Sequence, residues 1–437
     1  SKNYMKKALF LLLILIRYKV VPLSKKFSKH QNKNSVSNYS TENYRVWPLF
    51  MLSFIRLFYV SIFERALQNY LLFDIKINPP TLGIVSSAGA IAYIFAPILG
   101  QFITSKLGIR NSLILSCVIT PILTGAQILY YEPWFLIICR ITLGLSLGVF
   151  WPNCFNLLSR WQKISNIERS NKNFKHFNFS WNSGFLLGLL VGYAWAFLWN
   201  DYFAMIISWG ISFLLIPVSF FLTKEARVSS SEQEPHIQID STISHIEIKE
   251  NNPMIIYPIL FSWIGILFLA IAKANFLFSY QIFLSVISND STPTYLVQFG
   301  IQATQLIGLT WINSMKVHNR KISVLISISF VMLFSSLIIF FDDIWFISII
   351  SVSTGLFFGL IHGTSMKIML EHGTAKNTSK FSTINEILVG IGFGLTPIIA
   401  GYVAVINIYF MFLFLSLWGF IVLIFLIYLS RNVKKYT

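Results

Sequence analysis

The chain has 437 residues, of which 55% are apolar and 12% are charged, about half the share of charged residues found in a typical soluble domain. This composition excludes an ordinary water-soluble enzyme and indicates a protein that crosses a membrane several times. The formal charge is +17, but the basic residues lie in an N-terminal segment and in short links between apolar runs, so we expect no nucleic-acid partner.

The N-terminal segment, residues 1–45, contains ten basic residues and one acidic residue. It includes an apolar stretch over residues 8–16, which is too short to cross a bilayer. Arg17 and Lys19 follow directly, and no small-residue cleavage site appears, which argues against a secretory signal. We therefore expect residues 1–45 to form a basic cytoplasmic arm.

Apolar runs of helical length fill most of the remaining chain. A helix needs roughly 20 apolar residues to cross the hydrocarbon core. Twelve runs meet this length, over residues 46–71, 81–104, 111–131, 134–158, 178–199, 202–223, 255–286, 293–315, 321–341, 344–370, 383–405 and 406–430. The polar segment 224–253 divides them six and six, so we predict bundles over 46–223 and 254–430, a cytoplasmic linker between them, and a cytoplasmic tail over 431–437.

The distribution of charge predicts the orientation of these spans. Twelve spans place both termini on one side, and if that side is the cytoplasm, 29 of the 34 basic residues lie inside. The outer loops then hold a single base, Lys76, and they hold the acidic residues Asp74, Glu132, Asp201, Asp290, Asp342 and Asp343. Basic residues are concentrated in cytoplasmic loops in this way. We predict a multi-pass protein of the cell membrane with both termini in the cytoplasm.

The two halves of the chain are related by an internal repeat. Residues 131–135 match residues 342–346 at a shift of 211, and both segments end in Trp-Phe. Similar shifts superpose three further pairs of residues. The basic pair Lys106 and Arg110 falls on Lys316 and Arg320. Two glycine pairs also match, with Gly144 and Gly148 on Gly355 and Gly359, and Gly184 and Gly188 on Gly390 and Gly394. Such a duplication predicts two six-helix bundles related by a pseudo-twofold axis.

Two local patterns resemble those of the major facilitator superfamily. The loop after the second span carries Gly100, Lys106, Gly108 and Arg110, although Ser105 stands where that family has an acidic residue. The fourth span carries Arg140, Gly144, Gly148 and Pro152. The resemblance implies an all-α membrane fold with twelve transmembrane helices, transport of a small molecule by alternating access, and a gating role for Lys106, Gly108 and Arg110.

Charged side chains inside the spans are the candidates for a functional site. Each costs about 2.5–3.5 kcal/mol to insert at the centre of a helix, so each is expected to have a partner or a solute to bind. Six residues qualify, namely Arg56, Glu64, Arg65, Arg140, Lys273 and Glu386. Helical spacing places Arg56 and Glu64 on one polar face of the first span, whereas Arg65 is near enough to the outer surface to reach water.

Polar side chains also form stripes on the seventh and eighth spans. Lys273, Tyr280 and Gln281 share one face of the seventh span, and three amides share a face of the eighth span, namely Gln298, Gln302 and Gln305. We expect these faces to line a solute site between the bundles. The amides could instead serve only to hold helices together.

Glu386 is the residue that we expect to carry proton coupling. If this carboxylate paired alternately with Lys273 or Arg56, its affinity for a proton would change between two states of the protein. A permanent structural ion pair is the alternative. His362 is a second candidate for proton transfer, although a single histidine in a membrane helix is also compatible with packing.

These features predict a secondary transporter. The charged residues inside the spans comprise four bases and two acids, which favours an organic anion or a sugar-like acid as the solute. No nucleotide loop, catalytic constellation, metal site or cofactor motif is present in the sequence. We expect a monomer in the lipid bilayer that binds a small-molecule substrate, with protons as an open second partner.

Two alternatives remain open at this point. The first is a drug/proton efflux antiporter, although the fifth span lacks the proline that follows glycine in the antiporter motif of the resembled family. The second is a membrane receptor or scaffold with a transporter-like fold that binds a ligand without moving it.

Overall fold

A computed structural model describes residues 45–164, 167–223, 254–341, 343–372, 378–430 and 434–436. The predicted basic arm before Arg45, the linker up to residue 253, Asp342 and most of the predicted tail lie outside these ranges.

The first half of the described chain consists of helices. They are α2 (Trp47–Asn69), which continues into the π-helical turn η1 (Tyr70–Asp74), α3 (Pro79–Leu107), α4 (Ile109–Leu129), α5 (Pro133–Ile164), α6 (Ile167–Leu198), α7 (Asp201–Ser212) and α8 (Leu215–Phe220). Asparagine side chains cap two of these helices, because Asn78 accepts from the backbone N–H of Thr81 at 2.9 Å and Asn200 accepts from that of Phe203 at 2.8 Å.

The sixth predicted span is divided into α7 and α8. Pro217 has no backbone N–H to donate to the carbonyl of Phe213, and its ring would clash with that carbonyl in a regular helix. The carbonyl of Phe213 instead accepts from the N–H of Ile216 at 3.1 Å, which tightens the turn between the two helices. The proline therefore explains why one predicted helix is seen as two.

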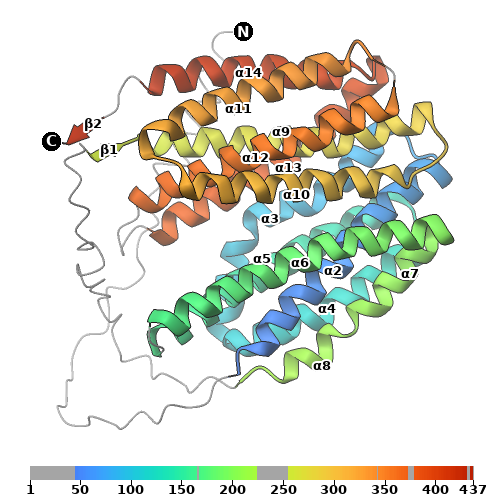
Figure 1. Ribbon diagram of the computed structural model, residues 1–437. Helices are drawn as coiled ribbons and strands as arrows, with labels where there is room; N and C mark the ends of the chain where they lie inside the picture. Colours follow the sequence, from blue (N-terminus) through green and yellow to red (C-terminus); the bar gives the residue numbers. More distant parts are fainter. Residues whose placement is uncertain are drawn as a thin grey trace, which may run out of the picture. The chain divides into compact units, whose positions relative to one another are not determined.

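The second half repeats this layout with six long helices. They are α9 (Ile259–Ile287), α10 (Pro293–Ser314), α11 (Val317–Ile338), α12 (Ile344–His372), α13 (Thr378–Ile406) and α14 (Phe410–Leu429). Figure 1 shows α9–α14 grouped together and α2, α4, α5, α6, α7 and α8 forming the other group. The described chain thus contains twelve membrane-length units, if α7 and α8 are taken as one.

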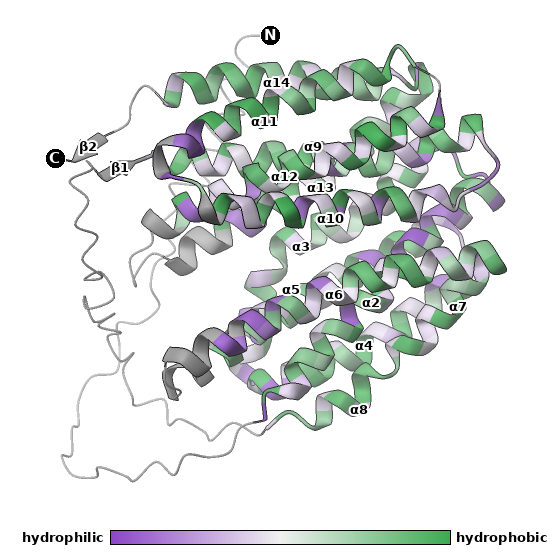
Figure 2. Ribbon diagram, in the orientation of Figure 1, coloured by the Kyte–Doolittle hydropathy of each residue, from purple (hydrophilic) through white to green (hydrophobic). Residues whose placement is uncertain are grey.

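Eleven of these units, among the described residues, are long and apolar enough to cross a membrane. The exception is α10, which is long enough but carries three glutamines, at positions 298, 302 and 305. Large apolar side chains are exposed on the outer faces of many helices, for example Trp345 at 79% and Leu129 at 84%, as expected where lipid is the solvent. Figure 2 shows α14 as hydrophobic along nearly its whole length.

The two halves begin and end on the same surface. The backbone N–H of Arg45 donates to the hydroxyl of Thr223 at 3.2 Å, and β1 (Met254–Ile256) pairs antiparallel with β2 (Lys434–Tyr436). This short sheet was not predicted and is an addition to the otherwise helical fold. We call this surface the linker side and the opposite one the outer side, after the predicted orientation.

Equivalent helices pack in equivalent ways in the two halves. A Cβ on Gly144 of α5 would overlap the carbonyl of Gly89 in α3, and a Cβ on Gly355 of α12 would overlap the carbonyl of Ile301 in α10. Glycine thus permits the close approach of the second and fourth helix of each bundle. The predicted fold of twelve helices in two pseudo-symmetric bundles is confirmed.

The repeat differs at the fifth helix of each bundle. Gly184 and Gly188 of α6 pack against α2 of their own bundle, whereas Gly390 and Gly394 of α13 pack against α3 of the other bundle. Instead, Gly392 of α13 contacts α9 of its own bundle. The sequence shift superposes these glycines by position, but their neighbours are not equivalent.

Candidate functional site

The two bundles meet along α3 and α13. Glycines on both helices allow backbone contact, because a Cβ on Gly83 would overlap the carbonyl of Pro397 and a Cβ on Gly401 would lie 2.5 Å from the carbonyl oxygen of Pro79. The contact runs from Gly401 toward the linker side and reaches the hydroxyl of Tyr93 in α3, which donates to Glu386 of α13 at 3.1 Å. It therefore follows about 22 Å of α13.

A cluster of hydrogen-bonded polar residues joins the bundles at the outer side. Asp201, at the start of α7, is 5% exposed and accepts hydrogen bonds from the hydroxyls of Tyr295 and Ser291 in the second half of the chain. Asn69 of α2 donates to Asp201 at 3.3 Å and to Thr294 at 2.9 Å.

Gln281 of α9 completes the cluster by donating to the Oδ1 atom of Asn69 at 2.8 Å. We call this set the outer polar cluster, comprising Asn69, Asp201, Gln281, Ser291, Thr294 and Tyr295.

Arg65 makes a further bond between the bundles. Its Nε donates to the Oε1 atom of Gln298 in α10 at 2.7 Å, and its side chain is 5% exposed. Glu64 and Asp201 are close enough to interact with it electrostatically. The expectation that Arg65 extends to water at the outer surface is therefore not what the structure shows, because a hydrogen-bond acceptor and two acidic groups hold it in the interior.

Most hydrogen bonds between the bundles lie at the outer side. Every hydrogen bond between the bundles that joins described residues lies either in the outer polar cluster, at Arg65–Gln298, or at Tyr93–Glu386. The last of these lies nearest the linker side. The structure thus represents an arrangement that is closed toward the outer surface.

Four polar side chains of the second bundle form a second cluster. The Nζ atom of Lys273 in α9 donates to the Oε1 atoms of Gln302 and Gln305 in α10, each at 2.7 Å. The Nε2 atom of Gln305 lies 3.4 Å from Nδ1 of His362 in α12. We call these four residues the amide–lysine cluster, which brings together residues that the sequence placed on three separate helices.

Glu386 does not belong to this cluster. Gly392 of α13 packs against Ala270 of α9, so Glu386 lies toward the linker side of that contact and Lys273 lies toward the outer side of it. The two residues are separated by roughly 14 Å along the helix axes. Glu386 bonds Tyr93 rather than Lys273 or Arg56, so this state does not contain either of the ion pairs that the sequence suggested.

Arg56 lies inside the first bundle rather than between the bundles. Its side chain is 0% exposed, its Nη1 donates to the hydroxyl of Ser116 in α4 at 3.3 Å, and its guanidinium lies 4.6 Å from the ring centre of Phe150. Its Nε and Nη2 atoms have no hydrogen-bond partner among the described residues. A solute between the bundles would not touch it in this state.

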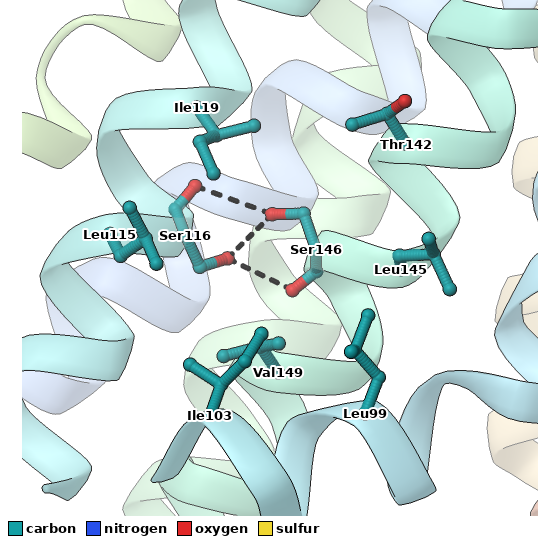
Figure 3. A pocket seen from close by; sticks show the side chains of 9 residues that line it. All are labelled: Leu99, Ile103, Leu115, Ser116, Ile119, Thr142, Leu145, Ser146 and Val149. Atoms are coloured by element: carbon teal, nitrogen blue, oxygen red, sulfur yellow. Dashed lines mark hydrogen bonds between the residues drawn. The ribbon is translucent and has the colours of Figure 1, made fainter. Parts of the chain in front are cut away.

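A small cavity of about 150 Å³ lies on the other side of Ser116. It is a half-open pocket lined by α3, α4 and α5 of the first bundle (Figure 3), and its lining is apolar except for three hydroxyl-bearing residues, Ser116, Thr142 and Ser146. Ser116 and Ser146 bond each other at 2.7 Å. Because no residue of the second bundle lines this cavity, it is separate from the interface between the bundles.

Glu64 of α2 forms an ion pair with Arg140 of α5, which links two predicted site residues within the first bundle. It is the only ion pair between described residues. Glu64 is 37% exposed and Arg140 is 5% exposed.

Two neighbouring predicted residues of α9 have different partners. Tyr280 shares a hydrogen bond of 2.7 Å with Ser348 of its own bundle, whereas Gln281 donates to Asn69 of the other bundle.

The predicted loop motif lies at the linker side, where α3 ends and α4 begins. Gly108 has φ +79°, a conformation that glycine adopts without a steric penalty. Arg110 donates to the carbonyls of Leu222 and Phe220 at 2.8 and 3.0 Å, and Lys106 lies over the ring of Phe102 at 4.2 Å. In this state the motif therefore contacts its own bundle.

Sequence reasoning found only Gln281 of the outer polar cluster, on the stripe of the seventh span. Asp201 was assigned to the outer loop between the fifth and sixth spans, and Asn69 carries no charge that would mark it. The available signal was that Asn200 already caps the helix that begins at Asp201, so the carboxylate of Asp201 is free to bond elsewhere. Its bonds to Ser291 and Tyr295 depend on tertiary contacts that no local pattern shows.

Comparisons with known proteins agree with this architecture. The sequence model of the Major Facilitator Superfamily matches residues 49–315. No curated protein sequence matches the chain.

Several solved structures share the fold. The nucleoside transporter NupG superposes with a TM-score of 0.68 at 15% identity, covering 89% of this chain and 99% of that one. A bacterial homolog to the human lysosomal transporter Spinster, in an inward-facing and occupied conformation, gives a TM-score of 0.67 at 12% identity, with coverages of 90% and 98%. A POT family transporter in complex with a thioalcohol conjugated peptide gives 0.68 at 13% identity, with coverages of 89% and 96%.

Proposed function

The chain belongs to the major facilitator superfamily, and we propose that it is a secondary transporter that moves a small solute across the cell membrane by alternating access. The observation that carries this proposal is that the hydrogen bonds between the bundles are concentrated at the outer side, around Asp201 and Arg65, with Tyr93–Glu386 as the one bond between described residues nearer the linker side. A site that opens to one side at a time requires such a closure to form and break in each cycle. The predicted orientation would make this an inward-open state.

The proposed solute site is the interface between the bundles on the linker side of the outer polar cluster. Lys273 and His362 of the second bundle are partly exposed there, and Glu64 of the first bundle is exposed at 37%. Partly exposed ionisable side chains at membrane depth are costly unless water or a solute reaches them. This supports a polar solute over a purely apolar one.

Glu386 is proposed as the site of proton coupling. It accepts a hydrogen bond from Tyr93 across the interface between α3 and α13. Loss of the negative charge would weaken this bond, because hydrogen bonds to an ionised acceptor are about twice as strong as neutral ones. Protonation would thereby loosen the linker-side end of this interface and leave the backbone contacts of Gly83 and Gly401 in place.

The test is uptake into proteoliposomes that contain the full chain. Organic anions, sugars and cationic dyes would be screened in counterflow, with and without a pH gradient. We expect saturable counterflow of one solute class, which mutation of Asp201 slows. Binding of a solute without counterflow would contradict transport and favour a receptor or scaffold. Export of cationic dyes from the vesicle lumen, driven by a proton gradient, would favour a drug antiporter.

A further inference from the structure

We propose that the amide–lysine cluster is a binding site for the carboxylate group of the transported solute. This inference deepens the proposed function and rests on it for the identity of the ligand as a solute. It concerns the chemistry of four side chains, namely Lys273, Gln302, Gln305 and His362.

The hydrogen bonds of the cluster direct both amide oxygens at the ammonium and leave most of the cluster's N–H donors free. A lysine ammonium has three N–H groups and no acceptor, so both amides that contact Lys273 present their oxygen atoms to it, at 2.7 Å each. The N–H groups of Gln302 and Gln305 therefore point away from Nζ.

One of these amides also fixes the role of His362. If the Nε2 atom of Gln305 donates to Nδ1 of His362 across 3.4 Å, the neutral imidazole carries its proton on Nε2 and is a donor there. The remaining binding capacity is the third N–H of the ammonium, the amide N–H groups and the imidazole N–H. The free N–H donors outnumber the remaining lone pairs of the amide oxygens, and the array carries a positive charge, so it is complementary to an anion.

The positive charge of Lys273 has no compensating carboxylate among the described residues, because the only ion pair between them joins Glu64 and Arg140. Glu386 lies roughly 14 Å farther along the helix axes, toward the linker side. The two amide oxygens solvate the ammonium but do not neutralise it. A mobile anion would do so, and it would be attracted by an unneutralised charge in a site with low dielectric surroundings.

The cluster faces the other bundle. Gln298 precedes Gln302 by one helical turn on the same stripe of α10 and bonds Arg65 of the first bundle. Gln281 follows Lys273 by two turns on α9 and bonds Asn69 of the first bundle. Both flanking contacts lie nearer the outer side, so the cluster lies just on the linker side of the closure, where a solute would be held beneath it.

The residue types also indicate how the group is held. Lysine is a compact point charge, unlike the planar fork of arginine that favours bidentate recognition. Gln302 and Gln305 are 8% and 5% exposed, whereas Lys273 and His362 are partly exposed. The lysine side chain is thus held in place by buried amides and is itself partly exposed, which suits one carboxylate of a small organic acid.

The experiment measures binding of acetate, the smallest carboxylate probe, to the purified full chain. The melting temperature is followed as acetate is titrated at constant ionic strength, and acetamide serves as the neutral probe of the same shape. We expect acetate and not acetamide to raise the melting temperature in a saturable manner. Lys273→Gln should weaken the apparent affinity for acetate by roughly 30-fold or more.

Two further variants separate a specific site from a general effect of salt or folding. Lys273→Arg keeps the positive charge and should retain acetate binding. Its affinity for acetate should fall by no more than about tenfold, because the longer head group fits the same acceptors less well. Lys316→Gln makes the same change at an exposed lysine on the linker side and should leave acetate binding unaltered.

Equal effects of acetate and acetamide, or equal acetate binding in wild type and Lys273→Gln, would overturn the inference. Its failure is distinguishable from that of the proposed function. Acetate binding that depends on Lys273, in a protein without counterflow of any solute, would retain the anion site and contradict transport. Counterflow of a neutral solute that acetate does not inhibit would retain transport and contradict the anion site.

Discussion

The two interfaces between the bundles are related by the pseudo-twofold axis, yet they are built differently. At α3 and α13, glycines bring backbones into contact along about 22 Å of helix, as at Gly83 and Gly401. At α6 and α10, the equivalent contact is confined to the outer end, where Gly192 packs on the ring of Tyr295 and a polar cluster surrounds Asp201.

The difference indicates a division of roles. Backbone packing through glycine has little freedom to repack once a side chain is added, so the α3/α13 interface resembles a fixed contact about which the bundles turn. Hydrogen bonds such as Tyr295–Asp201 can be exchanged for bonds to water, so the α6/α10 end resembles a contact that opens and closes. Substitutions on the two interfaces should therefore have different consequences.

The largest effect is expected from Gly83→Ala. The added Cβ would overlap the backbone carbonyl of Pro397, which cannot move aside as a flexible side chain could. Overpacking of this kind costs about 1–3 kcal/mol, and we expect a lower melting temperature and loss of most counterflow. Gly210→Ala is the matched control, because a Cβ there meets no atom within 4 Å and alanine favours the helix. Equal melting temperatures and equal counterflow rates of the two variants would show that the α3/α13 interface is not a fixed contact.

The next effect concerns the outer polar cluster. Tyr295→Phe removes a buried hydrogen bond of 2.6 Å to Asp201, which is worth about 1.5–3 kcal/mol because the acceptor is charged. The outer side should therefore open more often, with transport altered but folding retained. Tyr280→Phe is the control, since its hydroxyl bonds Ser348 within one bundle.

Alkylation of a cysteine at position 196 would report this opening. Ala196 lies one helical turn beyond Gly192 at the outer end of α6, is 7% exposed and is part of a buried hydrophobic cluster. In a background without the three native cysteines, the Ala196→Cys thiol should react at least tenfold faster with Tyr295→Phe than with Tyr280→Phe. Equal rates would show that the outer polar cluster does not hold the bundles together.

A smaller and more selective effect is expected at the linker-side end of the α3/α13 interface. Glu386→Gln should abolish accumulation driven by a pH gradient while leaving counterflow, because the amide keeps a bond to Tyr93 but cannot exchange a proton. Tyr93→Phe keeps the carboxylate and should retain coupling. Uptake with and without the gradient measures both, and unchanged accumulation in Glu386→Gln would exclude this residue from coupling.

The smallest effect is expected at the loop motif, which contacts neither interface in this state. Lys106→Gln changes an exposed side chain over Phe102 and should alter stability by no more than about 0.5 kcal/mol. Arg110→Gln removes two hydrogen bonds to carbonyls at the end of α8 and should destabilise the protein more, by about 0.5–1.5 kcal/mol, because water can replace bonds at a partly exposed site. Thermal melting compares them, and equal values would contradict the assigned contacts.

Most of the fold followed from local signals in the sequence. The length of apolar runs predicted the helices, and the matched Trp-Phe and glycine pairs predicted the two bundles, because these features depend on bilayer thickness and helix packing. The division of the sixth span at Pro217 was missed, although proline chemistry explains it. The β1/β2 pair was missed because three-residue strands have no periodicity to detect.

Less of the site could be predicted. Helical spacing placed Gln302 and Gln305 on one face, and the structure adds that Lys273 bonds both. Spacing could not show that Arg56 turns toward Ser116 rather than toward the other bundle, nor that Arg65 finds an acceptor in Gln298. The partner of a buried polar group depends on how helices distant in sequence are rotated against each other, which a single stripe does not define.

Alternating access requires the two bundles to rock about one interface while the other opens and closes. Spin labels on Lys76 and Asp290 would report the outer side, and labels on Lys175 and Lys316 would report the linker side, all four being exposed positions. We expect the outer distance to lengthen as the linker-side distance shortens when solute or pH is varied. Distances that stay constant, or that change together in the same direction, would contradict alternating access.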